Sequence, residues 1–177
     1  MKHVVFVVAL LLALWPFASH AADYAALEGK DFYAGGVVLV FFGENPAGDS
    51  ARESFIGPSA GGLTDGLAWQ AFMGFSWDEG ATMFGGSVDA ILADNFDECG
   101  APCEGDAIPM WWAGAGGTLV AYQDLFETAS GSSISGEELG INVGAGYFWE
   151  DFIANIYVHF FPDSSSTLIS ASVMKAF

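Results

Sequence analysis

Basic side chains are the residues that this sequence most clearly lacks. Of its 177 residues only 4 are lysine or arginine, against 22 aspartate and glutamate, and the formal net charge is −18. A protein that binds nucleic acid needs basic residues that neutralise phosphates, and its affinity depends on how many it has. The composition therefore excludes nucleic acid as a partner.

Long uninterrupted apolar runs are also scarce, and the only one lies near the start of the chain. The run from Val4 to Trp15 follows a short basic segment and precedes small residues that end at Ala21. This order is typical of a secretory signal peptide; a retained membrane anchor is the alternative. No other segment approaches the ~18 apolar residues of a membrane-spanning helix. We predict a signal peptide at residues 1–21 and one exported domain at residues 22–177.

Cysteine is nearly absent, because the chain has only Cys99 and Cys103. Both lie in the acidic segment "DNFDECGAPCEGD". In an exported chain, two cysteines this close together are expected to form a local disulfide. A metal site is the alternative, but two sulfurs without a nearby histidine do not complete a zinc shell. We predict no cofactor site, no metal site and no catalytic residues.

Apolar and small residues are abundant: 53% of the chain is hydrophobic, with 16 phenylalanines and 23 glycines. In several segments the apolar residues recur at every second position, which is the period of a β-strand, and frequent glycine argues against helices there. The predicted strands are 32–42, 66–77, 82–96, 107–115, 118–127, 138–149, 152–160 and 167–177. Gly116 and Gly117 separate the fourth strand from the fifth, as a two-residue hairpin turn.

The segments between these strands alternate in length. The long ones are 44–65, 97–106 and 128–137, and the short ones are 78–80, 116–117 and 150–151. This alternation is typical of an all-β, up-and-down antiparallel barrel with tight turns at one end and loops at the other. We therefore predict a closed barrel of eight strands.

Most predicted strands have one bulky apolar face and one face of glycine or small polar residues. Because an eight-stranded barrel encloses a lumen only wide enough for side chains, we expect the bulky face outside. That is the arrangement of a transmembrane barrel, with short periplasmic turns and longer extracellular loops; a soluble, lipid-binding, lipocalin-like barrel is the alternative. Aromatic residues near strand ends predict two interfacial girdles. We assign Trp77 and Trp149 to the short-turn end, and Trp111 and Trp112 to the long-loop end.

Several short motifs support a family resemblance. The segment "VGAGYFWED" joins a strand to an acidic turn, "WAGAGG" has the same character, and the chain ends on Phe177. In these features residues 22–177 resemble the small outer-membrane barrels of the OmpA and OmpX type. The resemblance implies a monomer in the outer membrane of a Gram-negative bacterium, in contact with lipid and lipopolysaccharide. It also implies that the barrel assembly machinery reads Phe177 as an assembly signal. Lys175 departs from the family pattern, but its side chain can snorkel to the membrane interface.

The predicted inner face contains polar residues: Asp89, Glu138, Asn142, Asn155 and His159. We assign no lysine or arginine to that face, so the acids must be hydrated, protonated or neutralised by cations that enter. Antiparallel pairing sets Ser170 or Leu168 opposite His159. A serine–histidine pair would suit a lipid-modifying enzyme, but this pair faces the lumen and not lipid. We therefore expect His159 to form hydrogen bonds within the lumen, and we predict that the protein is not an enzyme.

Most acidic residues lie between the predicted strands, among them Asp49, Glu53, Asp94, Asp97, Glu98, Glu104, Asp106, Glu127, Glu137 and Asp163. Their simplest role is to keep the loops hydrated. Clustered carboxylates also bind divalent cations, which would bridge the loops to anionic lipopolysaccharide. We predict a structural or surface-interaction protein that displays acidic loops outside the cell.

Overall fold

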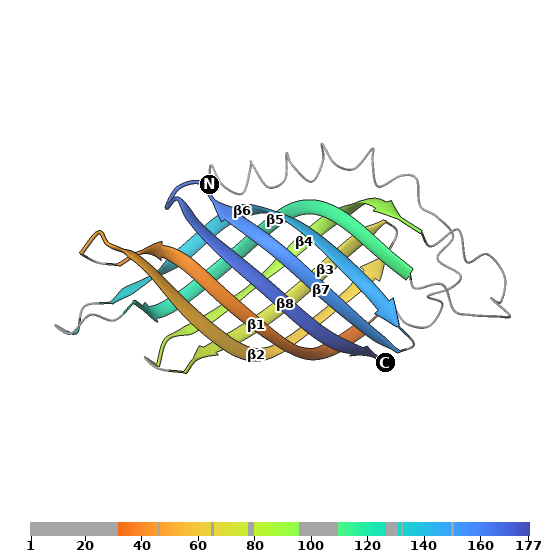
Figure 1. Cartoon of the computed structure of the whole chain (residues 1–177), viewed down its shortest axis with the longest axis horizontal. Coiled ribbons are helices and arrows are strands. Elements are labelled where there is room, and N and C mark those ends of the chain that lie inside the picture. The colour runs from red at the N-terminus through yellow and green to blue at the C-terminus, as the bar shows by residue number, and fades with distance from the viewer. Residues whose placement is uncertain are drawn as a thin grey trace, which may run out of the picture.

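The structure is a computed structural model that describes residues 32–45, 47–64, 66–77, 80–95, 110–126, 131, 133–149 and 151–177. In this part of the chain, strands pair in sequence order and close into one antiparallel barrel (Figure 1). They are β1 (Phe32–Glu44), β2 (Ser50–Thr64), β3 (Leu67–Ser76), β4 (Thr82–Asp94), β5 (Met110–Leu125), β6 (Ile134–Trp149), β7 (Phe152–Phe161) and β8 (Ser166–Ala176). The predicted eight-stranded, up-and-down barrel is confirmed.

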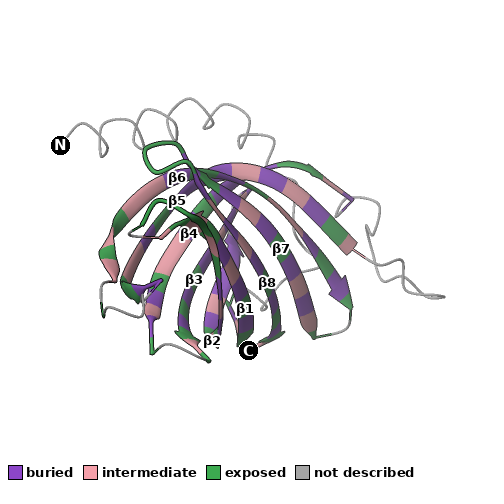
Figure 2. Ribbon diagram, turned by 60° about the vertical axis from the view of Figure 1, so that its left-hand side comes forward, coloured by how far each residue is buried: buried purple, intermediate pink, exposed green. Residues whose placement is uncertain are grey.

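Side-chain direction alternates along each strand, as the period of two predicts. In β7, for example, Ile153, Asn155, Tyr157 and His159 are buried, whereas Ile156 is exposed. Figure 2 shows the same alternation as bands of buried and more exposed residues along the ribbons. Each strand therefore has one face toward the lumen and one toward the surroundings of the barrel.

The second strand, β2, lies within a segment that the sequence predicts to be a loop, and that prediction is wrong. Its sequence, "SARESFIGPSAGGLT", contains glycine, serine and proline and has little β-propensity of its own. It nevertheless pairs with β1 without a break, from Phe32 opposite Gly62 to Glu44 opposite Ser50. Pro58 lies where the register between β2 and β3 is interrupted, so its missing N–H disrupts no ladder bond there.

The predicted turn at Gly116-Gly117 is also wrong. Both glycines lie in the middle of β5, a single strand of 16 residues. The prediction therefore missed one strand, β2, and split another, β5. These two errors cancel in the strand count but place several residues at the wrong end of the barrel.

The two ends of the barrel differ in their connections. The end where β1 begins and β8 ends, here called the termini end, carries connections 65–66, 95–109 and 150–151. The opposite end, here called the far end, carries connections 45–49, 77–81, 126–133 and 162–165. The long connection 95–109 thus lies at the termini end, where only short turns are predicted. Cys99 and Cys103 belong to this connection, and they lie outside the described residues, as does the predicted signal peptide, 1–21.

Two apolar clusters fill the ends of the lumen. The far cluster includes Phe41, Phe55 and Phe161, and the termini cluster includes Tyr33 and Trp112. The lumen therefore holds several aromatic rings, although the sequence predicts the bulky face outside. Inward-facing glycines make the room: Gly144 lies opposite Tyr157, and a Cβ there would be 2.2 Å from the tyrosine ring. In the described part of the chain, no helix has the length and apolar character needed to cross a membrane.

Candidate functional site

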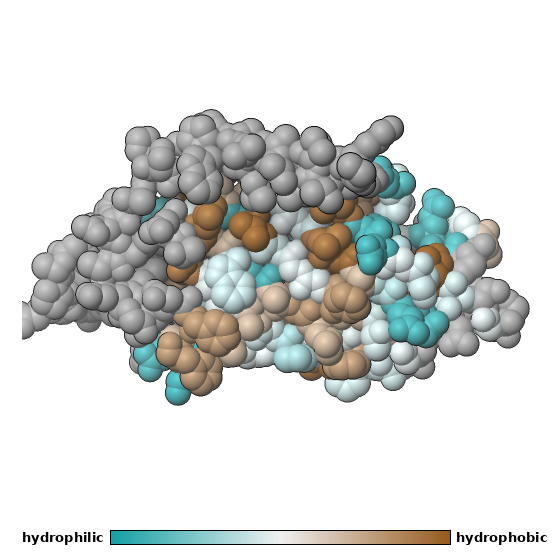
Figure 3. Space-filling model, turned by 180° about the vertical axis from the view of Figure 1, so that it is seen from behind, coloured by the Kyte–Doolittle hydropathy of each residue, from teal (hydrophilic) through white to brown (hydrophobic). Residues whose placement is uncertain are grey.

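The outer wall of the barrel is a belt of exposed apolar side chains. Figure 3 shows many of them gathered on the wall seen from behind. We call these residues the apolar belt: Val38, Ile56, Met73, Phe75, Phe84, Val88, Leu92, Leu119, Ile141, Val143, Ile156 and Val173. Each is 38% to 57% exposed, and together they go well beyond the scattered apolar residues of a soluble protein surface.

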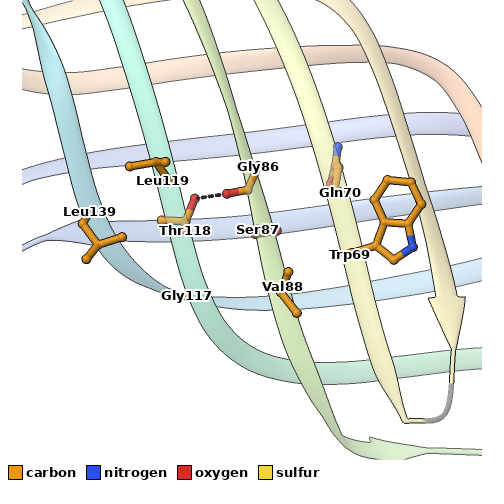
Figure 4. A pocket seen from close by; sticks show the side chains of 9 residues that line it. All are labelled: Trp69, Gln70, Gly86, Ser87, Val88, Gly117, Thr118, Leu119 and Leu139. Atoms are coloured by element: carbon orange, nitrogen blue, oxygen red, sulfur yellow. Dashed lines mark hydrogen bonds between the residues drawn. The ribbon is translucent and has the colours of Figure 1, made fainter. Parts of the chain in front are cut away.

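A shallow apolar groove of about 420 Å³ runs along the wall at β3, β4, β5 and β6 (Figure 4). Trp69, Val88 and Leu119 border it, and Gly86 and Gly117 leave its floor without side chains. The hydroxyl of Thr118 donates a hydrogen bond to the carbonyl oxygen of Gly86 at 3.1 Å. The groove is part of the apolar belt, and few polar atoms line it.

Aromatic side chains lie on the outer face near both ends of the barrel, but their distribution differs from the prediction. Trp149 is at the termini end as predicted, and it stacks on Phe152 with ring centroids 5.7 Å apart. Trp111 is exposed, but it lies at the termini end. Trp77 is 73% exposed and lies at the far end, beyond β3. Trp112 is 1% exposed and packs in the lumen against Tyr157.

The C-terminal residue, Phe177, continues β8 at the termini end. Its backbone N–H donates a hydrogen bond to the carbonyl oxygen of Phe32 at 3.0 Å, and its side chain is 74% exposed. Lys175 is also exposed, on the outer face of the same strand. Phe177 thus both prolongs the β1–β8 pairing and places an aromatic ring on the outer rim.

Asp89 and Asn142 meet inside the barrel although they lie on strands that are not neighbours. The amide of Asn142 donates a hydrogen bond to the carboxylate of Asp89. Between them, on β5, lies Gly116, which is the register partner of both residues. A Cβ on Gly116 would lie 2.0 Å from the carbonyl oxygen of Val88 and 2.7 Å from Asp89 Cα, so this position requires glycine.

His159 forms a hydrogen bond with a serine within the lumen. Its Nε2 lies 3.1 Å from Ser170 Oγ, and its cross-strand partner in register is Leu168. The imidazole ring stacks on Tyr157 with centroids 5.6 Å apart, and its Nδ1 has no hydrogen-bond partner. A catalytic serine–histidine pair requires a third group that orients the histidine and a route for substrate. This pair is buried in the lumen, and among the described residues no third group engages His159 Nδ1.

Two acidic residues at the far end of the lumen accept hydrogen bonds from neighbouring segments. Glu138 accepts hydrogen bonds from Tyr122 at 2.7 Å, Ser164 at 2.6 Å and Ser166 at 2.8 Å. Glu53, which the sequence predicts as a loop acid, is instead buried and accepts the backbone N–H of Phe126 at 2.9 Å.

More polar residues are buried in the lumen than the five that the sequence predicts. Asp89, Asn142, Asn155 and His159 are buried within it, but so are Gln70, Ser59, Ser87, Ser170 and Ser172. The alternation of inner and outer positions along the predicted strands places all of these residues in the lumen except Ser59. Ser59 lies in β2, the strand that the prediction missed. Among the residues that the structure describes, no three histidine, cysteine, aspartate or glutamate side chains form a group that could hold a metal ion.

Comparison with solved structures shows what kind of barrel this is. Neisserial surface protein A (NspA) has a TM-score of 0.50 and 18% identity, and the match covers 82% of this chain and 97% of that one. The N-terminal β-barrel domain of Pseudomonas aeruginosa OprF has a TM-score of 0.46 and 15% identity, covering 84% and 99%. Ail, the attachment invasion locus protein of Yersinia pestis, has a TM-score of 0.43 and 7% identity, covering 83% and 97%.

This chain therefore has the fold of the small outer-membrane barrels of the OmpA and OmpX type, the class that its sequence resembles. At 18% identity the likeness to NspA concerns the fold alone. No family model matches the sequence, and no characterised protein sequence matches it.

Proposed function

We propose that the protein is an integral barrel of the outer membrane of a Gram-negative bacterium, with a structural or surface-interaction role. The observation that supports this most directly is the reversed distribution of polarity. Apolar side chains such as Val143 and Ile156 are exposed on the wall, whereas Asp89, Asn142 and His159 are buried. Water would disfavour this arrangement, and a hydrocarbon environment favours it.

The closed sheet supports the same proposal. In hydrocarbon, each unpaired backbone N–H or C=O costs several kcal/mol, so a spanning sheet must have no free edge. Here β8 pairs with β1 from Phe42 opposite Thr167 to Tyr33 opposite Ala176. The eight strands therefore form a closed sheet with no free edge strand.

We place the termini end toward the periplasm, as is usual for barrels with an even number of strands. The far end then faces outward and carries exposed acids: Glu44, Asp49, Asp124, Glu137 and Asp163. This acidic rim suits hydration, and it also suits divalent cations that bridge it to lipopolysaccharide phosphates. Its partners in this proposal are membrane lipid, lipopolysaccharide and the barrel assembly machinery, and the protein acts as a monomer.

Two other functions have less support. A soluble lipid-carrying barrel requires Trp69, Phe75 and Tyr147 to line the lumen, but Phe75 and Tyr147 are 49% and 46% exposed on the outer wall. A lipid-modifying enzyme requires His159 to reach lipid, but His159 is 1% exposed and lies inside the barrel. We therefore propose that the protein has no catalytic activity.

Cell fractionation tests the proposal. The protein should be recovered with the outer membrane, and it should migrate faster on a denaturing gel before boiling than after, because a folded barrel resists detergent. Recovery from the periplasm as a soluble protein would contradict the proposal.

A further inference from the structure

The described part of the chain has two lysine or arginine residues, Arg52 and Lys175, and both are exposed on the outer wall of the barrel. Arg52 is on β2 near the far end, next to the inward-facing Glu53. Lys175 is on β8 near the termini end, next to the inward-facing Met174. The proposed function places this wall in the membrane, where a charge away from the headgroups is unfavourable. Each cation therefore needs an anionic partner at the surface of the membrane.

A single strand, β1, separates the two cations. Arg52 is the register partner of Phe42, near one end of β1, and Lys175 is the register partner of Ala34, near the other. The outward-facing residues between these two positions on β1 are Gly36, Val38 and Val40. The outward-facing residues beside them on β2 and β8 are likewise uncharged. This face thus has one positive charge near each end and an uncharged wall between them.

The two cations differ in height along the barrel axis by about the thickness of an apolar membrane layer. Register partners followed once around the barrel from Phe32 return to β1 at Phe42, which lies nearer the far end. Each step from β8 to β1 to β2 therefore also rises toward the far end. The residues from Ala34 to Phe42 at ~3.3 Å each and two strand spacings of ~4.8 Å, on strands tilted by ~40°, add to a height of about 26 Å. The apolar band of an outer-membrane barrel is about 25 Å tall.

An aromatic residue lies beside each cation. Phe42, the register partner of Arg52, is 39% exposed on the wall. Lys175 is also the register partner of Phe152 on β7, whose ring stacks on that of Trp149. Aromatic side chains on the outer face mark the level of the headgroups in membrane barrels. Both cations therefore lie at the level of a membrane–water interface.

Carboxylates of the protein itself are the competing partners. Glu44 is exposed at the end of β1, beyond Phe42, and Asp151 precedes Phe152 in the turn between β6 and β7. Exposed ion pairs of this kind stabilise a fold little, because water and salt screen them. Such a pair would also be indifferent to the lipid around the barrel. A change of lipid therefore distinguishes the two kinds of partner.

We propose that Arg52 and Lys175 each bind a phosphate group of a lipid headgroup, one in each leaflet, and thereby fix the depth of the barrel in the membrane. This inference rests on the proposed outer-membrane location. The guanidinium of Arg52 suits a phosphate because its planar N–H groups donate two parallel hydrogen bonds, and the ammonium of Lys175 binds phosphate as a point charge. Both side chains are long enough to reach the headgroups while their stems stay in the apolar layer. In the proposed orientation, Arg52 meets phosphates of lipopolysaccharide, and Lys175 meets those of phospholipids in the periplasmic leaflet.

Vesicles of defined headgroup charge test the proposal. The protein is folded into phosphatidylcholine vesicles and into vesicles in which part of that lipid is replaced by anionic phosphatidylglycerol. Urea unfolding gives the ratio of folded to unfolded protein, at about 0.15 M salt, where exposed charges act over only about 8 Å. Arg52→Gln and Lys175→Gln each remove one positive charge. Ala47→Asp, in the exposed far-end connection 45–49, changes the net charge by the same amount and is the matched control.

Phosphatidylglycerol should favour the wild type over each glutamine variant by about fivefold more than phosphatidylcholine does, the effect of one lysine or arginine near an anionic surface. Ala47→Asp should respond to the lipid as the wild type does. Arg52→Lys and Lys175→Arg keep the charge and should keep the wild-type response. These vesicles contain no assembly machinery, so the measurement reports lipid contact alone.

An equal lipid response of the wild type and either glutamine variant would overturn the proposal. A loss of stability that is the same in both lipids would also overturn it, because it indicates an ion pair within the protein. So would a response of Ala47→Asp that matches the glutamine variants, which indicates a general effect of net charge. Stabilisation of the wild type by inorganic phosphate in phosphatidylcholine vesicles would indicate a site for the free anion and overturn the choice of lipid. Cell fractionation judges the outer-membrane location independently of these outcomes.

Discussion

The carboxylate of Glu53 on β2 accepts the backbone N–H of Phe126, which follows β5, at 2.9 Å. This bond spans the far end of the lumen between strands that are not neighbours. It holds the segment after β5 inward, where Leu125 and Phe126 pack in the far cluster with Phe41. Asp124 and Phe126 adopt positive φ angles of 57° and 55°, and the register between β5 and β6 shifts here. Glu53 thus fixes an irregular segment that closes the lumen.

Replacing Glu53 tests this role. Glu53→Ala should lower the free energy of unfolding by about 1–3 kcal/mol, because the buried N–H of Phe126 loses its acceptor. Glu53→Gln keeps an acceptor oxygen and should lose clearly less. Urea unfolding in detergent micelles measures both. Equal losses for the two variants would show that the hydrogen bond is unimportant.

Gly116 should not tolerate any side chain. A Cβ at this position would lie 2.0 Å from the Val88 carbonyl oxygen and 2.7 Å from Asp89 Cα, which are backbone atoms that cannot move aside. We expect Gly116→Ala to cost about 3 kcal/mol or to abolish folding. Gly36→Ala is the matched control, since its Cβ would meet nothing closer than 3.8 Å. The folded fraction is read from heat-modifiable gel migration, and normal folding of Gly116→Ala would contradict the structure.

If the apolar belt faces lipid, a charged residue introduced there should destabilise the barrel. Val143 lies in the middle of β6 and is 51% exposed. We expect Val143→Arg to destabilise the barrel in bilayers by about 2–4 kcal/mol, the range for arginine at the midplane. Ser50→Arg, at the exposed far end, should have little effect. Unfolding measured in lipid vesicles decides the matter; if Val143→Arg is harmless there, the wall does not contact hydrocarbon.

Deletion of Phe177 should reduce insertion into the outer membrane without changing export. The deletion removes both the terminal aromatic residue and the hydrogen bond from its N–H to Phe32, so closure of β8 on β1 is weakened. Unfolded chain should accumulate in the periplasm, as pulse–chase fractionation would show. Lys175→Tyr should act in the opposite direction and raise the inserted fraction. Equal insertion of the deletion variant and the wild type would remove the assembly role of Phe177.

His159→Asn should leave lipid A unchanged. His159 is enclosed between Tyr157, Phe72 and Ser170 and has no route to lipid. Mass spectrometry of lipid A from cells with and without the variant provides the measurement. A change in acylation that depends on His159 would establish an enzyme and refute the non-catalytic proposal.

The sequence by itself determined the class of fold and most inward and outward orientations. The period of two in segments such as Phe152–Phe161 reflects local steric alternation, which every strand must obey. It therefore placed Asp89, Asn142 and His159 inside and Val143 outside before any contact was known. The abundance of bulky apolar residues on the opposite face then indicated a barrel in contact with lipid.

Tertiary structure alone decided where β2 lies, where β5 runs and what fills the lumen. β2 has little β-propensity, and it is a strand because β1 and β3 supply hydrogen-bond partners on both sides. The pair Gly116-Gly117 is compatible with a turn, and it lies within a strand because β4 and β6 pair with β5 on both sides of it. Trp112 lies inside because Gly146, on the neighbouring strand, leaves space for its ring. These outcomes depend on contacts between distant segments, and no local pattern encodes them.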